Sequence, residues 1–101
     1  MFKGGMASMM QKAQKMQSDI KLAQDEIKLL SCTGESASGG IKITINGQHQ
    51  TTAVEIDKGL LNDKGMLEDL IMMAINDASS QVNRISEEKM KGVTGGLNLP
   101  F

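Results

Sequence analysis

The chain has 101 residues, of which 11 are basic and 12 acidic, so its formal net charge is −1. A chain of this length forms one small domain and buries too little surface for a large internal cavity or an elaborate active site. A single cysteine excludes an internal disulfide, and with a single histidine it also excludes a Cys/His metal cluster. The only aromatic residues are two phenylalanines, so the chain lacks the stacking platforms that hold single-stranded nucleic acid.

A long amphipathic helix is predicted from Met6 to Leu30, after a flexible lead-in over residues 1–5. The pattern keeps its apolar stripe facing one partner helix, because apolar residues recur in alternating steps of three and four. The stripe consists of Met6, Met9, Ala13, Met16, Ile20, Ala23, Ile27 and Leu30. Such a helix is about 37 Å long, whereas a compact domain of this size is roughly 34 Å across. Part of the helix must therefore project into solvent or pack against a second copy of the chain.

The middle of the chain predicts a small antiparallel sheet. Its strands are expected between Ser31 and Gly40, over residues 41–45 and over residues 48–56. Between the last two strands, Asn46-Gly47 has the composition of a two-residue type I′ turn. That turn would place Ile43 opposite Gln50.

A second helix is predicted after Asp63, which can cap its first turn. Its apolar stripe consists of Leu67, Ile71, Ala74, Ala78, Val82 and Ile85, widened in the front half by Met66, Leu70, Met73 and Ile75. This front half is typical of a core or interface helix. Gly92 is expected to end the helix, leaving residues 92–101 as a loose tail. The expected fold class is α+β, in a single domain over residues 1–101.

The residues that could take part in catalysis lack the partner residues that catalysis requires. His49 lies beside the predicted turn without a nucleophile partner, and Cys32 has no basic neighbour to activate its thiol. The pairs Glu68-Asp69 and Glu87-Glu88 have no third metal ligand at helical spacing. We therefore expect no enzyme, no cofactor, no metal and no small-molecule substrate. Without a run of 18 apolar residues or a signal-peptide core, we also expect a soluble, cytoplasmic protein with no membrane partner.

The first helix carries an uneven distribution of charge. Residues 1–18 of the chain contain only positive charges, which come from Lys3, Lys12 and Lys15 and are interleaved with Gln11, Gln14 and Gln17. These side chains are hydrogen-bond donors suited to phosphates and groove edges. An ordinary solvated helix face has the same composition, so both interpretations stay open on the charges alone.

Several blocks in fixed order resemble one family over the whole chain. The blocks are MFKGGM at the start, Thr33–Ser36, the strand over residues 41–46, Val54–Asp57, Met66–Ile71, Ala74, Asn76–Ala78 and Glu87–Met90. In these blocks the chain resembles the YbaB/EbfC family of bacterial nucleoid-associated proteins. The resemblance implies an α-β-β-β-α protomer and a homodimer whose paired helical ends project like tweezers around duplex DNA.

The resemblance also implies where DNA would be contacted. The projecting ends of the family's first and last helices correspond here to Lys3, Gln11, Lys12, Lys15, Arg84, Lys89 and Lys91. We therefore predict a nucleoid-associated homodimer that binds double-stranded DNA mainly through phosphates and contributes to nucleoid organisation and gene regulation. The alternative is a protein-interaction module whose methionine-rich helical arm docks a partner protein.

Overall fold

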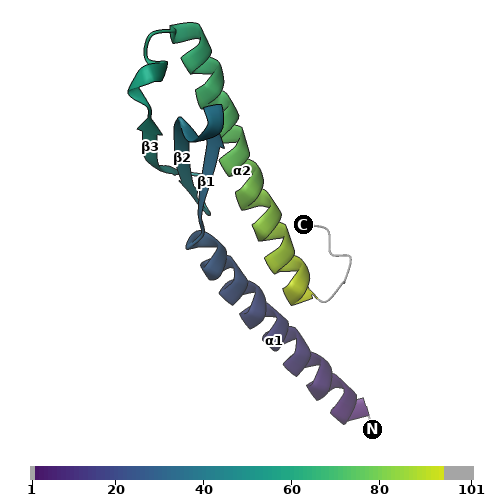
Figure 1. Cartoon of the computed structure of the whole chain (residues 1–101). Coiled ribbons are helices and arrows are strands. Elements are labelled where there is room, and N and C mark those ends of the chain that lie inside the picture. Colours follow the sequence, from purple (N-terminus) through teal and green to yellow (C-terminus); the bar gives the residue numbers. More distant parts are fainter. Residues whose placement is uncertain (1, 95–101) are drawn as a thin grey trace.

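The chain forms two long helices and a three-stranded sheet in the order α-β-β-β-α, which confirms the α+β prediction; the second helix lies along the sheet and the first extends away from it (Figure 1). The computed structural model describes the backbone of residues 2–94 and the side chains of residues 5–93. Its helices and strands are α1 (Phe2–Lys28), β1 (Ser31–Ser36), β2 (Ile41–Asn46), β3 (Thr51–Ile56) and α2 (Lys64–Thr94). The molecule is a rod with extents of 75 × 20 × 16 Å.

The core lies between α2 and one face of the antiparallel sheet, in which the strand order is β1-β2-β3. The central strand β2 alternates buried and more exposed residues, because successive side chains of a strand point to opposite faces. Its three isoleucines meet the predicted apolar stripe of α2. The fully buried members of this core are Cys32, Ile41, Ile43, Ile45, Ala74, Ala78 and Val82.

Helix α2 packs directly onto the backbone of β1 at Gly34. A Cβ atom at this position would collide with the carbonyl oxygen of Ala74 and the backbone nitrogen of Ala78. A hydrogen bond also stabilises this contact between α2 and β1: the backbone N–H of Glu35 donates to the Asp77 carboxylate at 3.0 Å. A glycine facing two alanines therefore sets how closely the helix and the strand approach.

The hairpin register differs from the two-residue turn that the sequence predicted. Ile43 pairs with Val54, four positions beyond the predicted Gln50, and the pairing shifts once more between Thr44 and Ile45. The connection is longer because the Asn46 side chain organises it. Its Oδ1 accepts hydrogen bonds from the backbone N–H groups of Gln48 and Gln50, at 2.9 and 3.0 Å.

Gly47 has a different role from the one predicted for it. The loop residue with a positive φ is His49, at 62°, and Gly47 is not among the residues with positive φ. A Cβ atom at Gly47 would instead collide with the backbone of Ile27 and Lys28 at the end of α1. Glycine is needed here because the hairpin loop lies against the last turn of that helix.

Each helix extends beyond one of its predicted ends, while α1 stops two residues before the predicted Leu30. Helix α1 begins at Phe2, so residues 2–5 are helical and not a lead-in, and it ends at Lys28. Helix α2 continues through Gly92 to Thr94. A glycine inside a helix costs only about 1 kcal/mol, which the packing of neighbouring residues can offset. The rest of the predicted tail, residues 95–101, lies outside the described residues.

The start of α2 agrees with its sequence signals. Asp63 precedes the helix, and its Oδ1 accepts a hydrogen bond from the backbone N–H of Met66 at 3.1 Å. This side chain satisfies one of the N–H groups that the first helical turn leaves without a partner, as the sequence predicted.

The second half of α1 packs against the last turns of α2. Ala23 is buried, and Met16, Ile20 and Ile27 of the same stripe are half-buried. An ion pair between Lys89 Nζ and Glu26 Oε2, at 3.3 Å, joins the two helices at their surface. The first half of α1 extends past the end of α2 (Figure 1). The expectation that one domain cannot bury the whole helix is confirmed.

Candidate nucleic-acid interface

The projecting part of α1, residues 2–18, is here called the arm. Every residue from Gly5 to Lys15 is exposed. Helix α2 ends beside the next turns of α1, where Gly92 and Val93 line a shallow hollow with Asp19 and Ala23. From Gly5 to Lys15 the arm therefore offers its full circumference to a partner, because the described part of the chain leaves these residues uncovered.

The arm holds three of the predicted DNA-binding side chains in solvent. Gln11, Lys12 and Lys15 are exposed, and neither lysine forms an ion pair with a described residue. Lys3 belongs to the same helix, but its side chain lies outside the described residues. Because no acidic residue precedes Asp19, the lysines of the arm have no neighbouring negative charge within residues 1–18.

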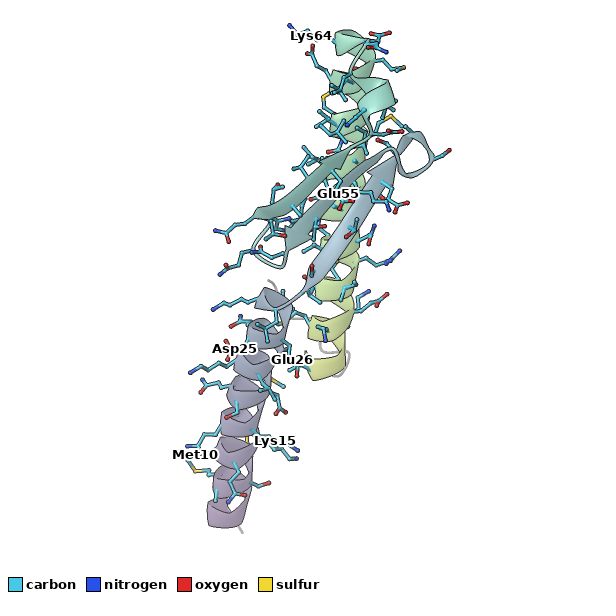
Figure 2. All side chains as sticks on the ribbon, turned by 60° about the vertical axis from the view of Figure 1, so that its left-hand side comes forward. Met10, Lys15, Asp25, Glu26, Glu55 and Lys64 are labelled. Atoms are coloured by element: carbon cyan, nitrogen blue, oxygen red, sulfur yellow. The ribbon has the colours of Figure 1, made fainter. Side chains whose placement is uncertain are left out.

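Lys15 and the apolar stripe lie on different sides of the arm. Figure 2 shows Met10 and Lys15 extending to opposite sides of α1. Helical geometry agrees, since the nine residues from Met6 to Lys15 correspond to a rotation of about 180°. Met6 and Met9 are 67% and 71% exposed. A partner that contacts Lys15 therefore approaches from the side opposite Met6, whereas Lys12, three residues after Met9, lies at the edge of the methionine side.

The basic face of the arm becomes acidic as it approaches the body. Lys12, Lys15, Asp19 and Glu26 follow one another in steps of three, four and seven, so they share one side of α1. A polyanion is attracted to the first two residues and repelled by the last two. The attraction of this side of α1 for a polyanion is therefore greatest at the projecting end.

The predicted residues of α2 lie in a mixed environment. Arg84 and Lys91 are exposed, while Lys89 is half-buried and paired with Glu26. The end of α2 lies beside Asp19, about one helical turn from Lys15. The structure thus brings the ends of the two helices together, but acidic residues separate the α2 cations from those of the arm.

Glu26 is a residue that sequence reasoning missed. It lies 63 positions from Lys89, and no local spacing rule relates residues so far apart in the chain. Only the antiparallel packing of α1 on α2 brings Glu26 to Lys89, where its carboxylate pairs with one of the predicted DNA-binding side chains.

Other functions could rest on His49, on metal-binding groups or on membrane-spanning helices within residues 5–93. His49 Nδ1 lies 3.5 Å from Ser79 Oγ, so the histidine joins the hairpin loop to α2. In this range, no three His, Cys, Asp or Glu side chains gather in a way that could hold a metal ion. Among the described helices, none combines the length and the apolar character needed to cross a membrane.

Two comparisons place the chain among known proteins. A family model, described as the YbaB/EbfC DNA-binding family, matches residues 2–97. The fold is also similar to the crystal structure of the uncharacterized protein HP0035 from Helicobacter pylori, with a TM-score of 0.75 and 21% sequence identity. That match covers 88% of this chain and 96% of the other. At this identity the structural likeness supports the fold alone.

Proposed function

Because the chain belongs to the YbaB/EbfC DNA-binding family, we propose that it binds double-stranded DNA as a homodimer, using the arms of both copies. The family gives the chain a DNA-binding, nucleoid-associated role. The observation that carries the finer proposal is the pair of exposed lysines, Lys12 and Lys15, on an arm that contains no acidic residue before Asp19. We propose a binding protein of the cytoplasmic nucleoid, without catalytic activity, that contributes to nucleoid organisation and gene regulation.

Phosphate contacts supply most of the proposed affinity. Lys12 and Lys15 carry compact charges on flexible stems, which suit phosphate oxygens better than base edges. Each phosphate that they neutralise releases counterions from the duplex, so binding weakens as salt rises. Gln11, on the same exposed helix, can donate to phosphates or to a groove edge. Lys3 extends this set toward the tip of the arm, and Arg84, Lys89 and Lys91 extend it toward the body.

The proposed dimer contact begins on the sheet. Val54 and Ile56 pair with Ile43 and Ile41, so their side chains share the face that packs on α2. Yet all six residues of β3 are exposed, and Val54 is 54% exposed, because α2 crosses β1 and β2 and leaves β3 uncovered. Apolar side chains on the core face of an uncovered strand favour burial against a second chain.

Helix α2 extends this apolar surface. The contact between Ser79 and His49 shows which side of α2 faces the hairpin. Met72 and Ile75 lie seven and four residues before Ser79, so they occupy the same side, and Met72 is 58% exposed. We define the dimer surface as Val54, Ile56, Met72 and Ile75. When this surface packs against the same surface of a second copy, the two protomers form a dimer. Each protomer contributes one arm, so the dimer has two.

Charge reversal on the arm tests the proposal. Lys12→Glu with Lys15→Glu replaces two exposed cations per chain, and the variant should bind a short duplex at least about a hundredfold more weakly at low salt. Lys58→Glu with Lys64→Glu makes the same charge change on exposed lysines, and Lys64 lies at the opposite end of the molecule (Figure 2). Equal losses in the two variants would show that only net charge matters and would contradict the arm as the binding site.

The dimer surface has its own matched pair of variants. Met72→Glu places a charge in the proposed contact, whereas Met73→Glu places it on the neighbouring residue, which is exposed to a similar degree, at 59%. Sedimentation velocity should give a single-chain mass for the first variant and a two-chain mass for the second. A dimer that survives Met72→Glu would refute this contact without affecting the evidence for the arm.

A further inference from the structure

The apolar seam of α1 is covered along one half and open along the other. We call its open part the methionine stripe, which consists of Met6, Met9, Ala13 and Met16. Further along the same heptad positions, Ile20 is half-buried and Ala23 is buried against the last turns of α2. On the stripe Ala13 is exposed, and Met6 and Met9 are two-thirds exposed or more. A seam with a period of 3.5 residues is suited to a second helix along its whole length.

Helix α2 shows how a helix packs on this seam. It runs antiparallel to α1 (Figure 1), and the ion pair between Lys89 and Glu26 joins the two helices. It ends where Gly92 and Val93 lie beside Asp19, at the body side of the arm. A second helix that continued along the seam in the direction of α2 would also be antiparallel to α1. The arm of a second copy is such a helix, because it carries the same seam.

Two antiparallel arms have matching side chains along the stripe. When Met6 of one copy lies opposite Met16 of the other, Met9 lies opposite Ala13, because each step toward one end is matched by a step toward the other. The small Ala13 leaves room for the long Met9 of the second copy, and this large-to-small contact occurs twice. At the two ends methionine meets methionine, whose flexible thioether adapts to irregular surfaces. The stripe is therefore complementary to itself.

We propose that the methionine stripe pairs with the stripe of a second copy, as two antiparallel arms related by a two-fold axis. Met10 and Lys12 flank the stripe on its two sides. Near the axis Met10, which is 62% exposed in the single chain, faces its own copy and enlarges the apolar contact. Lys12 also faces its own copy, and these like charges repel. At low salt the repulsion keeps this short contact weak, so the dimer surface determines the mass of the protein there.

Paired arms link one dimer to another. In an antiparallel pair the two bodies lie at opposite ends, because each arm points toward the body of the other copy. The sheet and the first half of α2 lie at the end of the rod away from the arm, so the dimer surfaces of both copies stay free (Figure 1). The linkage of dimers rests on the proposed dimer, whereas the pairing needs only the arm. Lys15 lies across the helix from Met6 and stays open to phosphates.

Disulfide trapping tests the pairing and its register. One chain carries Met9→Cys and another Ala13→Cys, both at exposed positions and in a Cys32→Ala background. Under copper-phenanthroline oxidation in about 0.5 M salt without DNA, their mixture should form at least about three times more interchain disulfide than either chain alone, because facing positions bring the two Cβ atoms close. Gln11→Cys mixed with Ala13→Cys is the control, since residue 11 lies about 160° around the helix from Met9. Equal yields in the two mixtures, or a larger yield from Met9→Cys alone, would overturn the antiparallel pairing.

The effect of salt distinguishes this pairing from DNA binding. Raising salt from about 50 to 500 mM screens the two Lys12 charges, so the mixed disulfide should form at least about twofold faster. Lys12→Gln should remove this dependence, and Lys15→Gln, on the far side of the arm, should keep it. Equal behaviour of these two variants, or a rate that falls with salt, would contradict the pairing. DNA binding weakens with salt, and Met72→Glu should leave the trapping unchanged, so each proposal can fail alone.

Discussion

Replacing Lys15 by Gln provides a way to count the arms that hold one duplex. The substitution removes one exposed cation per chain and keeps a side chain that can still donate hydrogen bonds. Each lost phosphate contact makes the slope of log K against log[salt] shallower by about 0.9. If both arms of a dimer grip the same duplex, the slope should change by about 1.8, and if one arm binds, by about 0.9. Between 50 and 200 mM salt, the two-arm case makes the loss of affinity roughly twelvefold smaller than in the unaltered protein.

The assay is fluorescence anisotropy with a short labelled duplex, repeated at six salt concentrations for each protein. Lys64→Gln is the matched control, because it removes an exposed lysine at the other end of the rod. Its slope should equal that of the unaltered protein. An unchanged slope for Lys15→Gln, or the same change in both variants, would refute the assignment of phosphate contacts to the arm.

Three further predictions follow from contacts in the body. Gly34→Ala forces a methyl group against the Ala74 carbonyl and should lower the free energy of unfolding by about 1–3 kcal/mol or more, measured by urea denaturation; an unchanged midpoint would show that α2 can move away. Asp63→Ala removes the cap of α2 and should cost about 1 kcal/mol, seen as a lower melting temperature; Asp63→Asn should restore most of it. Glu26→Gln frees Lys89 and should strengthen DNA binding roughly two- to fivefold, with less than about 1 kcal/mol change in stability; weaker binding would argue that the ion pair positions the helices for DNA.

The sequence predicted the elements well where one periodicity dominates. The stripe of α2 from Leu67 to Ile85 and the alternation of β2 both agree with the observed burial. The projection of α1 followed from its length alone. Lys12 and Lys15 are exposed as a basic face requires, and their contacts with DNA stay a prediction.

The hairpin shows where local rules fail. Asn-Gly is a strong two-residue turn signal, but here the Asn46 side chain caps a longer loop, and Gly47 is kept for its contact with α1. That contact is tertiary, between residues 20 positions apart in the chain, so no turn rule contains it. The Glu26–Lys89 pair escaped prediction for the same reason. Both the role of Gly47 and the pairing of Glu26 with Lys89 depend on packing between segments that are distant in the sequence.

The rod shape of the molecule changes what its net charge means. At physiological ionic strength, electrostatic interactions between exposed groups decay over about 8 Å, the Debye length. The molecule is 75 Å long, so acidic groups at the sheet end are many screening lengths from the tip of the arm. A duplex near the arm therefore responds to Lys12 and Lys15 as a local cationic site, although the whole chain carries a formal charge of −1. Elongation lets a small chain of net negative charge present a positive end to a polyanion, and Asp19 marks where that end stops.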